Sequence, residues 1–403
     1  MNAADTGWVL ASSALVLLMT PGLAMFYGGM TRSKNVLSTM MHSFFLMALA
    51  SIVWLFWGFS IAFGPDRFKG LLGGLNYFAL AGIGGEVWPG TTIPATTFMI
   101  FQAMFAIITP ALISGAFAER MKFSSFIVFM VLWLTFVYSP VCHWVWGPDG
   151  WLGKLGALDF AGGTVVHINS AAAALACALV IGKRKGYGTT PMMPHNLTLT
   201  LLGAGLLWFG WFGFNAGSAL AANAGASMAF VVTHMSTSAA AISWVSAEWI
   251  IKGKPTTLGV ASGAVAGLVA ITPAAGFVGP VSAVILGGVA GVLCYLAVLA
   301  KSSLGYDDSL DVVGIHGVGG AWGAIATGLF ASAAIGGTDG LFFGNSGQMW
   351  PQVIVVIATI AYSFVASVII LYVVKALMGL RVEEDEEVMG VDTSCHGETA
   401  YNL

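Results

Sequence analysis

The sequence predicts an all-α polytopic membrane protein, in which eleven transmembrane helices form two inverted five-helix repeats plus one extra helix. Only 8% of the 403 residues are charged, against about 25% in a soluble domain, whereas 58% are hydrophobic and the mean hydropathy is +0.87. Apolar runs long enough to cross a bilayer recur along the chain. The 53 glycines favour tightly packed membrane helices. This composition excludes soluble enzymes and nucleic-acid-binding proteins.

A membrane helix needs about 20 mostly apolar residues, and the chain offers eleven such runs. They are expected at 8–30, 36–63, 93–117, 123–145, 160–182, 197–221, 225–250, 256–275, 279–300, 311–334 and 350–377. The first run resembles a signal peptide, but its leader has no basic residue and no cleavage site follows, so we expect a retained helix. Residues 1–380 then form one membrane domain, followed by a tail at 381–403.

Basic residues predict the orientation, because loops rich in Lys and Arg stay in the cytoplasm. If the N-terminus is outside, 12 of the 15 basic residues lie at inner connections or at the end of the last span. Only Arg67, Lys69 and Lys154 then lie outside. We therefore predict a multi-pass protein of the cell membrane with a cytoplasmic C-terminus.

An inverted repeat is predicted between 8–182 and 197–334, with 350–377 as the extra helix. The sequence Ile-Thr-Pro-Ala occurs at 108–111 in the third span and at 271–274 in the eighth, which is the third of its half. His167 and His316 lie in the fifth span of each half. Because five is an odd number, the two halves run in opposite directions, and such repeats place substrate sites near the bilayer midplane.

His167 and His316 are the strongest candidates for a transport site. Each lies in a Gly- and Ala-rich span, and His167 lies about 12 Å below the outer start of its helix. An ionisable group at this depth is costly and by default marks a pathway for ions or protons. The small neighbours would allow the two imidazoles to meet. The alternative is a pair of neutral core histidines that hold the two halves together.

Carboxylates at the ends of spans are interpreted mainly as structural. Asp159 opens the fifth span and Asp311 precedes His316 in the same way, and both are expected to cap a helix rather than to bind a ligand directly. Two further acids are expected to form charge pairs at inner span ends, Glu119 with Arg120 and Glu248 with Lys252.

Aromatic residues amount to 12% of the chain, and a few of them could form a cation site. Phe101 and Phe105 are one helical turn apart, and Trp211 and Phe214 lead down the sixth span to Ser218. Aromatic faces combined with a hydroxyl suit a small cation that has lost water. The alternative is ordinary packing, which is the usual role of an aromatic stripe.

Several long motifs resemble those of the ammonium transporter family, Amt branch, of prokaryotic type. The run from Asp159 to Ala174, reading DFAGGTVVHINSAAAA, resembles the signature of that family. So do Thr20–Gly29, Phe209–Ser218, Asp311–Gly317 and the tail at Leu380–Glu384 and His396–Glu398. The resemblance covers nearly the whole chain. It implies an eleven-helix fold with the N-terminus outside, a homotrimer with one pore in each subunit, and no cofactor.

The resemblance also implies residue roles. Trp146, Phe105 and Ser218 would form an outer ammonium site, Phe105 and Phe214 a stacked gate, and His167 with His316 the pore. Asp159, Phe101, Trp211 and Asp311 would support them. The segment from Gly147 to Trp151 departs from the glycine-rich run of the family, so the outer rim is expected to differ. The implied mechanism deprotonates NH4+ and conducts NH3, with a separate proton relay.

Three alternatives remain open at this point. A gas channel of the Rh branch would move NH3 or CO2 without charge. A redox protein would use the two histidines as metal or haem ligands, although no third ligand has suitable spacing. An ammonium sensor would signal through a partner. The acidic run Glu383–Glu387 favours a solvated tail, with a docking element for a P-II type regulatory protein as the alternative.

Overall fold

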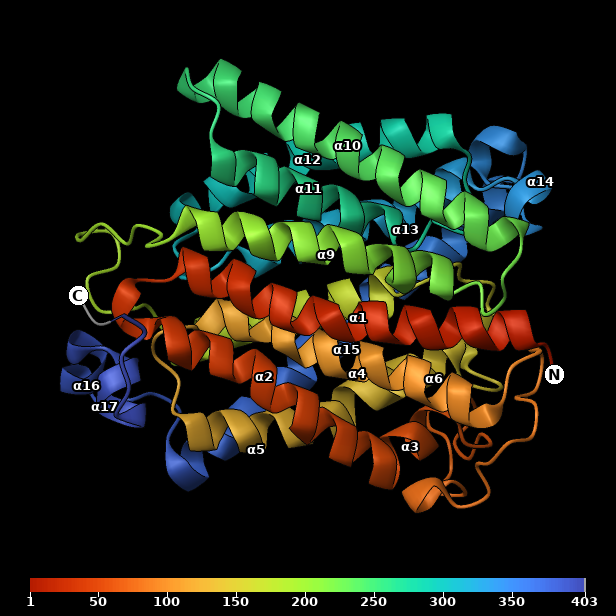
Figure 1. Cartoon of the computed structure of the whole chain (residues 1–403), viewed down its shortest axis with the longest axis horizontal. Helices are drawn as coiled ribbons and strands as arrows, with labels where there is room; N and C mark the ends of the chain where they lie inside the picture. Colours follow the sequence, from red (N-terminus) through yellow and green to blue (C-terminus); the bar gives the residue numbers. More distant parts are fainter. Residues whose placement is uncertain (402–403) are drawn as a thin grey trace.

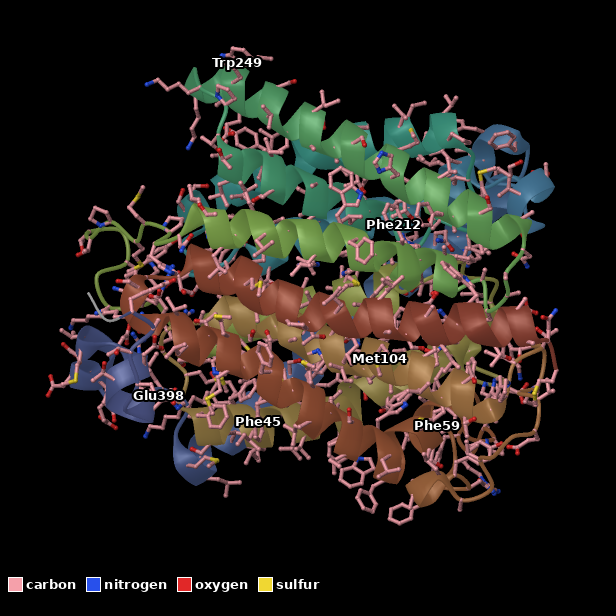
Figure 2. The ribbon with its side chains drawn as sticks, viewed as in Figure 1. Phe45, Phe59, Met104, Phe212, Trp249 and Glu398 are labelled. Carbon is pink, nitrogen blue, oxygen red and sulfur yellow. The ribbon has the colours of Figure 1, made fainter. Side chains whose placement is uncertain are left out.

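The computed structural model describes residues 1–401 and confirms the all-helical prediction. The long helices run side by side along the longest axis of the molecule (Figure 1). The N-terminus lies at one end of this bundle, and the short helices α16 and α17 lie at the other. We call these the N-terminal end and the tail end.

Ten helical segments among the described residues are long and apolar enough to cross a membrane, and one shorter apolar helix accompanies them. In the first half these are α1 (Ala3–Met30), α2–η2–α3 (Val36–Val53, Trp54–Gly58, Phe59–Phe63), α4 (Ala95–Phe117), α5–η4–α6 (Phe123–Trp133, Leu134–Tyr138, Ser139–Trp146) and η5–α8 (Gly163–Ile168, Asn169–Ile181). In the second half they are α9 (Leu197–Gly217), α10 (Ala224–Lys252), α11 (Thr257–Ile271), α12 (Pro280–Leu304) and η6–α13 (Val313–Val318, Gly319–Phe330), followed by α15 (Met349–Met378).

Short elements fill the connections and the tail. They are η1 (Ser33–Asn35), η3 (Phe78–Leu80), α7 (Trp151–Lys154), α14 (Ala333–Gly336), η7 (Leu341–Phe343), η8 (Ser346–Gln348), α16 (Glu384–Met389) and α17 (Val391–His396). The eleven predicted spans are all present as helices. The eighth is the shorter one, because α11 ends at Ile271, just before Pro273 of the second Ile-Thr-Pro-Ala sequence.

Four of the spans contain a π-helical turn, at η2, η4, η5 and η6. Such turns are rare and concentrate at functional sites. The last two occupy matching places in the halves: each is six residues long, and each contains one of the two histidines. The turns η2 and η4 interrupt the second and fourth spans, whereas η5 and η6 each contain one of the two histidines.

Glycines allow neighbouring helices to approach with their backbones in contact. A Cβ added to Gly203 of α9 would lie 2.3 Å from the amide nitrogen of Phe26 in α1. In α12, a Cβ on Gly287 would lie 2.1 Å from the carbonyl oxygen of Ser236 in α10. With no hydrophobic driving force between helices inside a membrane, this close packing is the main source of association.

The tail is folded onto the tail end of the bundle, which differs from the predicted solvated tail. The carboxylate of Asp392 accepts hydrogen bonds from the amides of Leu37 (2.9 Å) and Ser38 (2.8 Å) at the start of α2. Glu387 accepts from the side chain of Arg381 (2.7 Å), and both acids are almost completely buried. The acidic run is therefore partly a docking element for the chain itself.

The two adjacent glycines of α12 test the packing argument. Gly287→Ala should lower stability by about 1–3 kcal/mol, because its methyl group has no space against Ser236. Gly288→Ala is the matched control, since a Cβ there meets nothing within 4 Å. Thermal unfolding in detergent measures the difference. Equal melting temperatures for the two variants would contradict close packing of α10 on α12.

Candidate functional site

The two histidines meet in the centre of the bundle. The Nδ1 atoms of His167 and His316 are 3.2 Å apart, so one donates a hydrogen bond and the other accepts it. Their rings lie nearly parallel, with centroids 5.2 Å apart and planes at 22°. Both side chains are buried, and Nε2 of His167 has no hydrogen-bond partner. The pair therefore has at least one ring nitrogen free to handle a proton.

Aromatic and aliphatic side chains enclose this pair. Trp211 stacks on His167 at 5.3 Å and 19°, and its indole N–H donates to the hydroxyl of Thr272 (2.9 Å). The enclosed cavity is about 10 Å³, room for roughly one water-sized molecule. Besides the histidines it is lined by Met19, Leu23, Phe26, Ile108, Leu112, Val166, Leu207, Trp211, Phe214 and Val265. Among these lining side chains, the Trp211 indole N–H is bonded to Thr272, so the imidazoles are the polar groups that remain.

Small residues place the histidines against each other. Gly162 has φ 111°, a left-handed conformation that glycine adopts freely, and it precedes η5. A Cβ on Gly163 would lie 2.5 Å from the ring of Pro273, and one on Gly320 would lie 3.2 Å from Cβ of His167. The second Ile-Thr-Pro-Ala sequence therefore packs directly against the start of the first histidine helix.

A wider vestibule of about 190 Å³ lies toward the N-terminal end. The side chains of Phe105, Trp146 and Ser218 line it together, as does Phe101. Phe105 meets Trp146 edge to face at 5.8 Å and 85°. The hydroxyl of Ser218 donates to the carbonyl of Phe214 (2.8 Å), which leaves its oxygen lone pairs available as acceptors.

Gln102 is a vestibule residue to which the sequence interpretation gave no role. It lines the vestibule between Phe101 and Phe105, it is 8% exposed, and its Oε1 has no hydrogen-bond partner. A buried unpaired acceptor at this place favours a hydrogen-bond donor as the occupant. The signal in the sequence is weak, because one glutamine within an apolar helix resembles a packing residue.

Two phenylalanines separate the vestibule from the histidine cavity. The ring centroids of Phe105 and Phe214 are 4.4 Å apart, with Phe105 lining the vestibule and Phe214 lining the cavity. This contact closes the path between the two spaces. Both rings are completely buried among side chains, so an opening requires rotation of at least one of them.

Asp159 lies next to Phe160 of the vestibule lining, and both oxygens of its carboxylate accept hydrogen bonds from backbone amides. Its carboxylate accepts from the amides of residues 162, 163, 164 and 165, at 2.7–3.2 Å, and also from the Thr164 hydroxyl. In addition, the indole N–H of Trp146 donates to its carbonyl oxygen (2.8 Å). This geometry is that of a capping residue that also positions Trp146.

The corresponding acid of the second half is Asp308, and not Asp311 as the sequence interpretation had it. Asp308 is completely buried and accepts from the amide of Val313 (2.7 Å) at the start of η6. Asp311 instead has φ 62° and forms an ion pair with Lys301 (2.5 Å). The local sequence could not distinguish these two aspartates, because either one can cap the helix depending on the path of the loop.

The other predicted charge pairs also have different partners. Glu119 pairs with Arg32 (2.5 Å) rather than with Arg120. Arg120 donates to the carbonyls of Gly182 (2.9 Å) and Asp307 (2.6 Å), and burial lowers its pKa to about 10. Glu248 accepts from Thr256 (3.0 Å) instead of pairing with Lys252. These acids and Arg120 connect loops at the tail end.

The unusual segment Gly147–Trp151 packs against the loop that follows α3. The amide of Trp151 donates to the carbonyl of Gly70 (3.2 Å), and the indole of Trp144 donates to Leu71 (2.9 Å). A Cβ on Gly150 would lie 2.1 Å from the carbonyl oxygen of His143. The rim of the vestibule at this side is therefore held by close backbone contacts.

A metal site needs more ligands than the two histidines of the pair, and three or four protein ligands are usual for zinc. Among residues 1–401, no group of three His, Cys, Asp or Glu side chains could hold a metal ion.

Comparison with known proteins identifies the family. The profile of the Ammonium Transporter Family matches residues 7–401. The ammonium transporter of Bacillus subtilis is 51% identical over 407 residues, covering 100% of this chain and 99% of its own. Ammonium transporter Amt1 of Archaeoglobus fulgidus is 50% identical over 401 residues, covering 100% of both chains.

Solved structures agree with these sequence matches. The crystal structure of Saccharomyces cerevisiae Mep2 has a TM-score of 0.91 at 37% identity, covering 96% of this chain and 88% of its own. A sensor Amt protein has a TM-score of 0.91 at 30% identity, covering 97% and 98%. The chain therefore belongs to the ammonium transporter family.

Proposed function

We propose that this protein binds NH4+ in the vestibule, removes its proton and conducts NH3 past the two histidines. The observation that carries this proposal is the enclosed apolar cavity. It has room for about one water-sized molecule, and the imidazoles of His167 and His316 line it. Such a cavity suits a small neutral molecule with hydrogen-bonding capacity. The protein would then supply cellular nitrogen by uptake through a cell membrane.

The free energy of desolvation explains why the proton must leave. Moving an unpaired cation out of water into an apolar space costs at least several kcal/mol. Neutral ammonia carries no such penalty beyond lost hydrogen bonds, and the histidine nitrogens can replace part of these. Potassium has no proton to release, so the same barrier would exclude it although its size is similar.

The vestibule has the groups that a partly dehydrated ammonium ion needs. The faces of Phe105 and Trp146 would attract the cation, and the Ser218 oxygen would accept one of its hydrogens. The unpaired Oε1 of Gln102 offers another acceptor. Rotation of Phe105 or Phe214 would then open the way to the histidine cavity.

The histidine pair would relay the released proton, so that transport moves charge. The Nδ1–Nδ1 hydrogen bond links the two imidazoles, and Nε2 of His167 is unpaired. An electroneutral channel of the Rh type would instead leave the proton outside. Charge movement therefore distinguishes the two mechanisms.

We further propose that the N-terminus lies outside, that the tail is cytoplasmic and that the protein is a homotrimer. The basic residues Arg32, Lys122 and Lys185 all lie at the tail end, as expected for a cytoplasmic surface. A P-II type regulatory protein would dock there, beside a cavity of about 470 Å³ between residues 183–189 and the tail.

Removing either imidazole should abolish selective transport. His167→Ala and His316→Ala should each lose the transient current that an ammonium pulse evokes from proteoliposomes on a solid-supported membrane, because the proton loses its relay. His234→Ala, at an exposed position, is the control and should keep the wild-type current. Flux in the double variant that still excludes potassium would refute the assignment.

Removing the vestibule hydroxyl should weaken binding rather than turnover. Ser218→Ala should raise the KM for ammonium about tenfold with little change in maximal current, since a hydrogen bond to a charged group contributes about 1.5–3 kcal/mol. Ser346→Ala, at an exposed position in η8, is the control. An unchanged KM in the Ser218 variant would place the cation elsewhere.

A further inference from the structure

The two halves of the bundle each place an aspartate at the same distance from a pore histidine. Asp159 precedes His167 by eight residues, and Asp308 precedes His316 by eight. Both carboxylates accept hydrogen bonds from amides at the start of the π-helical turn that carries the histidine. Because the halves are inverted, Asp159 belongs to the vestibule side of the histidine pair and Asp308 to the tail end.

The two aspartates differ in the number of hydrogen bonds that their carboxylate oxygens accept. Both oxygens of Asp159 accept hydrogen bonds, from four amides and a hydroxyl. In Asp308, Oδ2 accepts from Val313, whereas Oδ1 has no partner although the residue is 0% exposed. A buried carboxylate oxygen without a donor is costly when ionised, and protonation removes that cost. The capping role accounts for one oxygen of Asp308 and leaves the other unexplained.

The titratable groups around Asp308 have opposite effects on its pKa. The groups that interact with its charge are Tyr27 of α1, Arg184 of the loop after α8, Lys301 of α12, and Tyr306 and Asp311 of its own loop. Asp307, next to it, is occupied by a bidentate contact with Arg184 (2.8 and 2.9 Å). Burial and the charge of Asp311 raise the pKa of Asp308, whereas Lys301 and the backbone amides of Val313 and Val312 lower it, with a result of about 6.

Asp308 also lies beside the tail end of the pore. A Cβ on Gly115 of α4 would meet both the Tyr27 ring (2.8 Å) and the Val312 side chain (2.7 Å), so these residues are in one layer. The Tyr27 hydroxyl donates to the carbonyl of Leu112 (3.1 Å), a residue that lines the histidine cavity. Tyr27 therefore contacts a lining residue of that cavity and also interacts electrostatically with Asp308.

We propose that Asp308 is the proton acceptor at the tail end of the pore, which receives the proton from the histidine pair and releases it to the cytoplasm. An N–H bond of the imidazolium at His316 breaks as its proton passes to a water molecule, and that proton is handed along a chain of water molecules until an O–H bond forms on Oδ1 of Asp308. That O–H bond then breaks, and the proton passes to water at the tail end. The proposal rests on the proposed proton relay, and it makes the relay directional: one aspartate is locked as a cap and the other is free to titrate.

Asp308→Asn separates this role from capping, because the asparagine oxygen can still accept from Val313. The variant should lose about 100-fold of the ammonium-evoked current, the usual loss for an acid–base group. Asp308→Glu keeps a titratable carboxyl and should retain most of the current. A purely structural role predicts instead that the asparagine variant transports normally and that the glutamate, with its longer side chain, is the more damaging change.

Infrared difference spectra give a readout that does not depend on transport. Wild-type protein should show a carboxyl C=O band that appears as the pH falls through about 6, and Asp308→Asn should lack it. Asp311→Asn is the matched control: the band should remain, with its midpoint shifted to lower pH, because a like charge that raises the pKa is gone.

Below the midpoint the carboxyl of Asp308 is already protonated, so the wild-type current should fall as the pH at the tail end drops below about 6.

The outcomes distinguish this proposal from the proposed function. Wild-type current and pH dependence in Asp308→Asn would overturn the role of Asp308, as would the absence of a titrating band in wild-type protein. The histidine relay would still stand if His167→Ala loses its current. If His167→Ala keeps the current, the proposed function itself fails. Loss of both the band and the current in Asp308→Asn, with recovery in Asp308→Glu, supports the proposal.

Discussion

The free-energy cost of placing a charge or an unpaired polar group away from water governs this structure. It explains why every span is helical, with its backbone hydrogen bonds satisfied internally. It also explains the elaborate capping at Asp159 and the many donors of Arg120, whose guanidinium contacts carbonyls of three connections. Under the proposed function, the same cost would let a neutral molecule pass the histidine cavity and would exclude an ion.

Close backbone packing shapes the histidine cavity. Gly163 lies against Pro273 and Gly320 lies against His167, so the two histidine helices cross without large side chains between them. The imidazoles can then touch at 3.2 Å in the middle of the protein. A larger residue at either glycine would push the helices apart and leave empty space around the two imidazole rings. The narrowness of the histidine cavity is therefore a property of the small residues packed between the two histidine helices.

Much of the fold and part of the site could be predicted from the sequence. Long apolar runs have few structural alternatives, so the spans were predictable, and the depth of His167 and His316 within such runs distinguished them from surface histidines. Partners that are distant in the sequence were not predictable. Glu119 lies next to Arg120 in the chain but pairs with Arg32, because Arg120 turns into the backbone carbonyls. Asp308 and Asp311 could be told apart only once the loop path was known, since the left-handed conformation of Asp311 directs it to Lys301.

The contact between Asp392 and the start of α2 has a consequence for how the protein is handled. The second span begins with amides that have their acceptor in a residue more than 350 positions later, close to the end of the chain. A C-terminal truncation before Val391 would leave these amides without that carboxylate and would also remove the Val391 amide that donates to Asn35. Affinity tags and fusion partners for purification are therefore better attached beyond Tyr401 through a flexible linker, because Tyr401 itself contacts His195.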